Sequence, residues 1–439
     1  MDGVFLRSMR VSVFGLGYVG CVMTACLARN GHDVVGVDVN PEKVQRIDRG
    51  ESPVDEPGVG EAIAEGAEAG CVVATTDAGE AVSKTDVSFL TVGTPLDDTG
   101  QLNTTNLYNV LDSAAPAIDR KGEHTVVVRS TVPPRTTRNL RSYLREKVGD
   151  DTNVDFAVNP EFIREGSAMS DFFDPPYVVV GSFADDDPGQ VLDLYRTLDV
   201  DGEVRIVTPE QAESLKMVNN AFHALKICFA NEIGSVVSAA GVDGKELMEL
   251  VCADEKLNIS DQYMEPGFAF GGSCLPKDTR AVATIAENAG VETPLISSIP
   301  ESNDNHIERV RDLVESMDGD TVGIVGVAFK SNTADMRNSP GLRLASRVDG
   351  ETLLYAGDLD PSAALGSNRE YLDRVMPDIE DRLVSDPDAF LDSVDVVVFA
   401  NDCSHPELTA CLDDTPVCDP VGTVRELADA IDEYHAVSW

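Results

Sequence analysis

Residues 10–20 read RVSVFGLGYVG, and this stretch decides the fold of the N-terminal part of the chain. A run rich in β-forming residues, 10–14, leads into a G-x-G-x-x-G motif, and a helical pattern follows as far as Arg29. A second predicted strand, 33–38, ends at an acid, Asp38, roughly twenty residues after the motif. The motif alone is a weak signal, but strand, helix and acid together predict a dinucleotide-binding βαβ unit.

Each glycine of the motif has its own expected role. Gly15 allows the tight turn, Gly17 lets a pyrophosphate approach the helix N-terminus, and Gly20 permits close packing of helix and strand. Asp38 is expected to accept hydrogen bonds from ribose hydroxyls and to repel a 2′-phosphate, and no arginine follows it directly. The sequence therefore favours NAD over NADP; the alternative is a glycine-rich turn that binds no ligand.

Strand and helix patterns alternate at both ends of the chain but not in its middle. One long helical pattern with few breakers runs over 209–241, and shorter ones follow near 243–252 and 276–289. The sequence therefore predicts an α/β protein with two Rossmann-like, doubly wound parallel-sheet domains joined by an all-α central domain. The predicted strands are 10–14, 33–38, 71–75, 87–92, 125–131, 154–158, 177–181, 321–325, 352–355, 394–400 and 416–418.

These patterns divide the chain into three predicted domains, residues 1–205, 206–305 and 306–439. The first holds the dinucleotide motif, the second is helical, and the third is a second nucleotide-binding-like domain. A long apolar helix favours dimerisation, so we expect a homodimer or a higher homo-oligomer; an internal core helix of a monomer is the alternative. Met9, directly before the first strand, is a second candidate for the true start of the protein.

The charge of the chain is strongly negative, with 77 acidic residues against 34 lysines and arginines and a formal net charge of −43. Such a field argues against nucleic acid and anionic membranes as partners, and no apolar run reaches membrane-spanning length. Acid spread along the whole chain predicts a halophilic protein. At about 1 M salt the Debye length is only roughly 3 Å, so the repulsion of an anionic substrate would be screened.

Cysteine and histidine usage predicts neither a metal site nor a disulfide framework. The nine cysteines include no C-x-x-C pair, and the six histidines show no metal-ligand spacing. A reducing cytoplasm is the compartment that such usage favours.

Residues 268–278 read FAFGGSCLPKD and place one cysteine, Cys274, in a setting that suits a nucleophile. Gly271 and Gly272 leave the backbone bare before the thiol, so that another molecule can approach, and Pro276 favours the first turn of a helix. A helix N-terminus is expected to lower the pKa of a thiol and to favour the thiolate. A buried structural cysteine is the alternative.

A nicotinamide domain, a nucleophilic thiol and a second nucleotide-like domain in one chain suggest a particular reaction. A hydride acceptor turns an alcohol into an aldehyde, which a thiolate captures as a thiohemiacetal. A second hydride transfer gives a thioester, which water cleaves to an acid. The net reaction is a four-electron oxidation that uses two NAD per substrate.

Specific motifs occur in a fixed order along the chain: GLGYVG at 15–20, VGTP at 92–95, RSTVPP at 129–134, NPEFIREG at 159–166, ESLKMVNNAFHA at 213–224, FANEIG at 229–234, PGFAFGGSCLPKD at 266–278 and GVAFKSNTADMRNSP at 326–340. From Met9 onward the chain closely resembles the UDP-glucose/GDP-mannose dehydrogenase family, the nucleotide-sugar 6-dehydrogenases. The resemblance implies NAD-dependent oxidation of the sugar C6 hydroxyl of GDP-mannose or UDP-glucose to the uronate. It also implies that 206–305 is a dimerisation domain and that 306–439 binds the sugar nucleotide.

The resemblance assigns roles to individual residues. Cys274 is the nucleophile, Lys216 holds the developing alkoxide or oxyanion, and Asn220 fixes the thiohemiacetal oxygen. Asp278 orients Lys216 or a water, while Thr131, Glu161 and Glu165 order water and substrate near the nicotinamide. Further implied cofactor contacts are Tyr18, Val19, Lys43, Thr94, Thr131, Lys277 and Arg337, and further implied substrate contacts are His223, Asn231, Tyr263, Phe268, Gly271 and Lys330. The alternative for each is an ordinary solvent-facing side chain.

Three positions depart from the family pattern. Glu265 replaces an arginine that GDP-mannose enzymes carry there, Ala334 replaces a common aspartate, and Arg135 stands where a turn glycine is usual. The motif PGFAFGGSCLPKD, the run 124–132 and the terminal Trp439 nevertheless look more like GDP-mannose dehydrogenases.

Other functions stay open at this point. The substrate could be a UDP-N-acetyl-hexosamine. A single-step hydroxyacid or 6-phosphogluconate-type dehydrogenase shares the N-terminal fold and a helical middle but needs no activated cysteine. A non-catalytic NAD-binding regulator would bind cofactor without turning over any sugar nucleotide.

Overall fold

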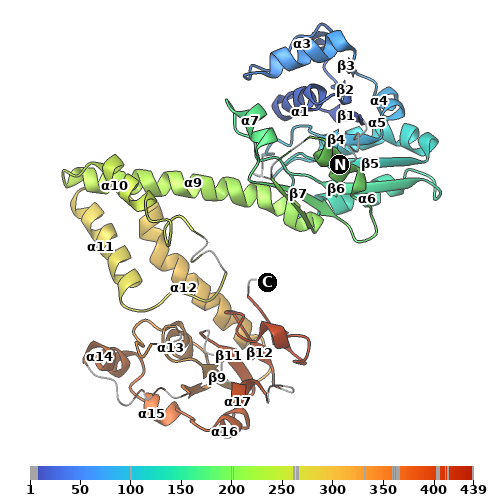
Figure 1. The fold of residues 1–439 in the computed structure, drawn as a ribbon. Helices are drawn as coiled ribbons and strands as arrows, with labels where there is room; N and C mark the ends of the chain where they lie inside the picture. Colours follow the sequence, from blue (N-terminus) through green and yellow to red (C-terminus); the bar gives the residue numbers. More distant parts are fainter. Residues whose placement is uncertain are drawn as a thin grey trace, which may run out of the picture. The chain divides into compact units, whose positions relative to one another are not determined.

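The computed structural model describes residues 8–98, 101–198, 200, 202–260, 263, 266–330, 333–357, 359, 361, 366–401, 406–410, 412 and 415–437 (Figure 1). The chain forms two compact units, Met1–Ala224 and Leu225–Trp439, which we call the N-terminal and the C-terminal unit. The departures Glu265 and Trp439 lie outside the described residues.

Alternating strands and helices build the N-terminal unit. Its strands are β1 (Arg10–Phe14), β2 (Asp33–Val37), β3 (Val72–Thr75), β4 (Val87–Leu90), β5 (Glu123–Val128), β6 (Asn153–Val158), β7 (Tyr177–Ser182) and β8 (Glu203–Val207). Its helices are α1 (Tyr18–Arg29), α2 (Pro41–Asp48), α3 (Val59–Ala69), α4 (Ala78–Lys84), α5 (Thr105–Lys121), α6 (Thr136–Arg145), α7 (Ala168–Phe173) and α8 (Gly189–Thr197). The long helix α9 (Pro209–Ala239) begins in this unit and confirms the helix predicted over 209–241.

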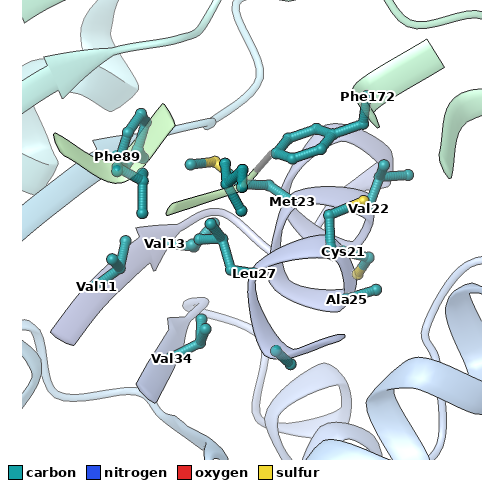
Figure 2. Close-up of a cluster of buried hydrophobic side chains, with 14 of the residues drawn as sticks. Val11, Val13, Cys21, Val22, Met23, Ala25, Leu27, Val34, Phe89 and Phe172 are labelled. Carbon is teal, nitrogen blue, oxygen red and sulfur yellow. The ribbon is translucent and has the colours of Figure 1, made fainter. Parts of the chain in front are cut away.

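The strands form one sheet in the order β3-β2-β1-β4-β5-β6-β7-β8, with β1 to β6 parallel. This is the strand order of a Rossmann domain, extended by two strands. One core cluster packs α1, α3 and α7 on one face of the sheet, and another packs α4, α5 and α6 on the other. Figure 2 shows the first of these clusters, in which Met23 and Leu27 of α1 lie beside Val13 and Phe89 of the sheet.

The end of this sheet differs from the prediction. β7 runs antiparallel to β6, and β8, which was not predicted, pairs with β7 at the edge. The sequence of β7, YVVVGS, is a continuous apolar run like those of the parallel strands, so its pattern does not reveal its direction. β8, with the sequence EVRIV, alternates charged and apolar residues at its start, but a run of five mostly exposed residues is a weak signal for a strand.

The C-terminal unit begins with helices and ends in a second sheet. Its helices are α10 (Gly244–Cys252), α11 (Cys274–Asn288), α12 (Pro294–Glu315), α13 (Pro340–Ala345), α14 (Gly366–Val375), α15 (Ile379–Arg382), α16 (Pro387–Leu391), α17 (Pro406–Thr409) and the 3₁₀ turn η2 (Arg425–Leu427). Its strands are β9 (Thr321–Val325), β10 (Glu351–Tyr355), β11 (Val396–Phe399), β12 (Val417–Cys418) and β13 (Tyr434–His435). They are all parallel, in the order β10-β9-β11-β12-β13.

This order is the second common doubly wound arrangement, so the predicted parallel sheet of the C-terminal part is confirmed. Helix α12 and strand β13 were not predicted. α12 contains Pro300, a residue that normally ends a helical pattern, and the predicted boundary at 305/306 falls inside this helix. The three domain ranges therefore stay a proposal. Among the described residues no helix is long and apolar enough to span a membrane.

Arg135 precedes α6 with a left-handed backbone, at φ +76°, where the family resemblance led us to expect a glycine. Its N–H and that of Thr137 each donate to the carboxylate of Glu213 on α9, at 2.6 Å. Glu213 is buried, and burial raises the pKa of its carboxyl group. The N-terminus of α6 is thus capped from α9 rather than by its own N-cap side chain.

Replacing Arg135 with glycine is expected to increase the free energy of unfolding by up to about 1 kcal/mol. The left-handed conformation costs a residue with a Cβ roughly 1–2 kcal/mol, and the larger unfolded-state entropy of glycine offsets part of that gain. Denaturant unfolding of the full chain in concentrated KCl measures the change. Arg135→Ala is the control, because it removes the guanidinium but keeps the Cβ. Equal stabilisation by both variants would show that charge, not backbone conformation, is responsible.

Candidate active site

The glycine-rich turn between β1 and α1 is built as the sequence predicts. Gly15 has φ +105°, and a Cβ there would lie 2.9 Å from the carbonyl oxygen of Thr91. A Cβ on Gly20 would overlap the carbonyl oxygen of Gly15, so helix and turn meet backbone to backbone. A Cβ on Gly17 would meet no protein atom within 4 Å, so the space beside this glycine is open to a ligand.

Asp38, at the end of β2, closes the same turn. Its carboxylate accepts hydrogen bonds from the backbone N–H of Leu16 (2.8 Å) and of Asn40 (2.9 Å), and it pairs with the Lys43 ammonium at 3.0 Å. An ionised carboxylate has about four lone-pair sites, so these three contacts leave room for a ribose hydroxyl. The side chain is therefore held in a fixed orientation before any ligand arrives.

Gly15, Gly17, Asp38 and Lys43 line a pocket of about 830 Å³ at the carboxyl ends of the strands. Other lining residues are Phe14, Val37, Val39, Thr76, Asp77, Ala78, Gly79, Thr91, Val92, Gly93, Asn106, Asn109, Val110 and Ser113. Ligands of doubly wound sheets bind at this edge. The pocket fits the adenosine diphosphate part of a dinucleotide. Its glycines leave space, the carboxylate of Asp38 is already oriented, and the N-terminus of α1 can bind phosphate.

Tyr18 and Thr94, both implied cofactor contacts, are each held by a hydrogen bond, and neither is among the described residues that line the pocket. The hydroxyl of Tyr18 donates to Glu56 at 2.7 Å, and burial, with Glu56 second, raises the pKa of this phenol well above its usual range. Thr94 donates to the carbonyl oxygen of Thr131 at 2.6 Å, which joins two of the predicted residues, and Val19 lies half-buried in the first turn of α1.

Glu56 is a residue that sequence reasoning missed. It is 6% exposed and also accepts the backbone N–H of Gly166 (2.8 Å) and of Ala168 (2.9 Å). The segment 161–168 is thereby tied to the start of α1. One glutamate among 77 acidic residues carries no signal for this role in the sequence alone.

Lys216 and Glu161 form an ion pair at 2.9 Å, with side chains only 13% and 11% exposed. Glu161 follows β6, and its second carboxylate oxygen accepts the N–H of Ile163 at 2.9 Å. Phe162 lies beside the pair, with its ring centre 6.0 Å from the ammonium group. The ammonium group and the carboxylate are therefore largely shielded from water and hold each other in place. The alternative that these two are ordinary solvent-facing side chains is wrong.

The other predicted residues of this region lie at the surface. Asn220 and His223 are exposed on α9, and Glu165 is exposed after the segment that carries Glu161. Asn220 and His223 lie four and seven positions beyond Lys216, so the three share one helix face.

Cys274 is exposed, so the alternative of a buried structural cysteine is wrong. It lies at a helix N-terminus, as predicted, but α11 begins at Cys274 itself rather than at residue 276. Its Sγ lies 3.7 Å from the hydroxyl of Ser273. The thiol therefore stands at the end of the helix where free N–H groups and the positive end of the dipole stabilise negative charge.

The glycines before Cys274 serve a contact within the chain itself. A Cβ on Gly271 would overlap the carbonyl oxygen of Asn338, and Gly272, at φ +79°, donates to the carbonyl oxygen of Arg337 at 2.8 Å. Gly272 in turn accepts from the Asn338 side chain at 2.8 Å. The expected approach of another molecule at Gly271 is thus replaced by the loop 333–338, which places Arg337 beside the cysteine turn.

Arg337 is fixed by Asp335 at 2.7 Å, and this pairing raises the pKa of its guanidinium. Lys277 and Asp278 pair with each other at 3.3 Å and are 70% and 68% exposed. The expected role of Asp278, to orient Lys216 or a water, stays a prediction, and within the N-terminal unit Lys216 is held by Glu161. Asn231, Tyr263 and Lys330 are exposed, while Phe268 is half-buried against the core of the C-terminal unit.

A dinucleotide pocket whose acid suits an unphosphorylated ribose, together with an exposed thiol at a helix start, defines an NAD-dependent oxidoreductase. The chain belongs to the UDP-glucose/GDP-mannose dehydrogenase family: the model of the family's NAD binding domain matches residues 9–199, and that of its central domain matches 210–305. Its cofactor is NAD, and members of the family act on nucleotide sugars.

Curated relatives cover nearly the full length. The GDP-mannose 6-dehydrogenase of Pseudomonas aeruginosa is 43% identical over 401 residues, which are 90% of this chain and 91% of that one. The UDP-glucose 6-dehydrogenase of Haloferax volcanii is 34% identical over 408 residues, 89% and 92% of the two chains. A solved ternary complex of GDP-mannose dehydrogenase from Pseudomonas aeruginosa matches with a TM-score of 0.91 at 38% identity, covering 98% of this chain and 100% of that one.

Asp38→Asn is expected to weaken NADH binding by about tenfold and to bring the affinities for NADH and NADPH closer together. The substitution removes the charge that attracts ribose hydroxyls and repels a 2′-phosphate, and a charge-assisted hydrogen bond contributes roughly 1.5–3 kcal/mol. Cofactor fluorescence titrations of the full chain measure both dissociation constants. Glu42→Gln, on α2 but outside the pocket lining, is the control. If the ratio of the NADH and NADPH dissociation constants did not change, the role assigned to Asp38 would be contradicted.

Proposed function

We propose that the chain oxidises the C6 hydroxyl of GDP-mannose to the carboxylate, with Cys274 as the covalent nucleophile. The observation that carries this proposal is the exposed thiol at the first residue of α11, in a chain of this family. NAD, when bound, accepts a hydride in each of the two oxidations. UDP-glucose is the alternative substrate.

Lys216 and Glu161, which form the shielded ion pair, stabilise charge and position water during the reaction. An ammonium group that is 13% exposed stabilises an alkoxide or oxyanion more strongly than one in open water, because the surroundings screen it less. Glu161 keeps that ammonium in place and offers a carboxylate for a water molecule. Asn220, one helical turn further along α9, is proposed to hold the thiohemiacetal oxygen.

The thiolate of Cys274 adds to the C6 aldehyde and forms a carbon–sulfur bond, and the oxygen takes the negative charge. Loss of hydride from that carbon gives a thioester. Water then attacks the thioester carbonyl carbon, the carbon–sulfur bond breaks, the thiolate and the carboxylate are released, and the two protons of the water pass to solvent. Two hydrides leave per carboxylate formed.

GDP-mannose is preferred to UDP-glucose because relatives that act on it are more similar to this chain. Identity is 43% to a GDP-mannose enzyme and 34% to a UDP-glucose enzyme, over comparable lengths. Glu265, where GDP-mannose enzymes carry an arginine, is the departure that speaks for the alternative. The three domain roles given above, cofactor binding, dimerisation and sugar-nucleotide binding, are part of this proposal.

A panel of sugar nucleotides assayed with NAD in concentrated KCl tests the proposal. GDP-mannose is expected to have the highest kcat/KM, by at least about tenfold over UDP-glucose and UDP-N-acetyl-hexosamines, because a site built for one base leaves polar groups unpaired with another. Two NADH per sugar are expected. One NADH per sugar would overturn the four-electron reaction, whereas preference for UDP-glucose would overturn only the choice of substrate.

Two variants serve as controls in the same assay. Cys274→Ser should abolish uronate formation and leave NADH affinity nearly unchanged, while Cys252→Ser, another exposed cysteine of the C-terminal unit, should keep full activity. Lys216→Ala should lower kcat more than cofactor affinity. Uronate production by Cys274→Ser would refute the covalent step.

We also propose that α9 forms the interface of a homodimer. Val218, Phe222, Leu225 and Phe229 follow one another at spacings of four and three residues, and each is 37% to 60% exposed. Such a stripe on a 31-residue helix matches the self-complementary surface that a two-fold dimer needs.

A light-scattering mass of twice 47.0 kDa is expected for the native chain. Val218→Glu combined with Leu225→Glu should halve that mass, because two buried charges without partners oppose association. Leu96→Glu, at a 67% exposed leucine in a loop of the N-terminal unit, should leave the mass unchanged. A monomeric native chain would contradict the proposal.

A further inference from the structure

Four arginines surround a second pocket, of about 410 Å³, which lies wholly within the C-terminal unit. Arg280 belongs to α11, Arg343 to α13, Arg347 follows that helix directly, and Arg374 belongs to α14. Three separate elements therefore bring their cations to one cavity. Asp304 is the one carboxylate among the described residues that line it.

The arginines are only partly neutralised. Arg343 and Arg347 both contact Asp304, and Arg347 also pairs with Glu308 at 2.9 Å. Within the described part of the chain, neither Arg280 nor Arg374 has a carboxylate at ion-pair distance. A local excess of cations is unexpected in a chain with a net charge of −43, in which acids outnumber lysines and arginines by 77 to 34.

The guanidinium groups also repel one another. Burial, and then the neighbouring Arg347, lowers the pKa of Arg343, and Arg280 acts in the same direction. Like charges held together in a partly buried site cost free energy unless a counter-charge is present. An anion in the pocket would remove that cost.

The walls of the pocket are partly apolar. Phe270, Pro276 and Pro300 contribute apolar surface, and Tyr371, 6% exposed, closes one side. Asn303 is fixed by two hydrogen bonds to the backbone of Phe270, at 2.9 and 3.0 Å. Asn303 is thus fixed in the wall of the cavity, whose volume lies in the range of small-molecule sites.

We propose that this pocket binds a phosphate or diphosphate group of a small phosphorylated ligand, bridging α11, α13 and α14. Guanidinium groups match tetrahedral oxyanions in fork geometry, and several arginines around one cavity select a multiply charged anion over a monovalent one. The apolar walls suit the organic part of such a ligand. Because α11 begins with Cys274, a ligand bound in this pocket would also stabilise the position of the helix that carries the nucleophile.

Isothermal titration of the full chain with pyrophosphate and with inorganic phosphate, in concentrated potassium glutamate, tests the pocket. Arg280→Gln combined with Arg374→Gln removes two cations that have no ion pair in the described structure. The variant should still fold, because the one ring contact that it loses there, of Arg374 with Tyr371 at 5.6 Å, is a weak interaction. It should bind pyrophosphate at least about tenfold more weakly. Arg369→Gln is the control, because Arg369 also lies on α14 but pairs with Asp373 and Glu380 outside the pocket.

Absence of pyrophosphate binding by the native chain, or equal binding by the double variant, overturns the proposal; equal weakening in Arg369→Gln overturns it too. The binding test needs no turnover, so it stands or fails separately from the proposed function. A second arm, which rests on that function, gives the source of the phosphate. A raised KM for GDP-mannose in the double variant assigns the pocket to the substrate diphosphate, and an unchanged KM assigns it to a separate phosphorylated ligand.

Discussion

Backbone-to-backbone contact at glycine is the constraint on which the candidate site depends. Any side chain at Gly20 would overlap the carbonyl oxygen of Gly15 and push α1 away from the turn that holds Asp38. The second sheet uses the same device, since a Cβ on Gly341, in α13, would overlap the carbonyl oxygen of Gly326 after β9. In both places a helix is drawn onto a strand end, where doubly wound folds bind ligands.

The cysteine turn follows the same physical rule with a different result. Gly271 is bare so that Asn338 of the loop 333–338 can lie against it, Gly272 has a left-handed backbone, and two hydrogen bonds join Gly272 to Arg337 and Asn338. A thiol on a freely moving loop would sample many orientations, whereas this one starts a helix, and the turn directly before that helix is held by a second segment. Precision of this kind is what covalent catalysis needs from its nucleophile.

Local features were predictable from the sequence, and contacts between distant residues were not. The turn at Gly15, the acid at Asp38 and the helix start at Cys274 each depend on fewer than about thirty consecutive residues, which is the span of one βαβ unit. The partner of Lys216 could not be predicted, because Glu161 is on another element and many acids compete for the role. Glu56 was missed for the same reason.

The irregular features of the fold could not be predicted from sequence patterns either. The direction of β7 depends on the chain path after β6 rather than on its own apolar residues, and α12 contains a proline that argues against a helix. Arg135 was recognised as a departure from a family glycine, but only the structure shows its left-handed backbone and the buried Glu213 that holds it. Tertiary contacts overrode local preference in each case.

Salt screens exposed and buried ion pairs of this chain to different degrees. Lys277 and Asp278 are about two-thirds exposed, so their attraction is screened at the high ionic strength that so acidic a protein is expected to require. Lys216 and Glu161 are 13% and 11% exposed, and little electrolyte can come between them. The orientation of the proposed catalytic cation is therefore kept under conditions in which surface electrostatics fade, because burial rather than net charge protects it.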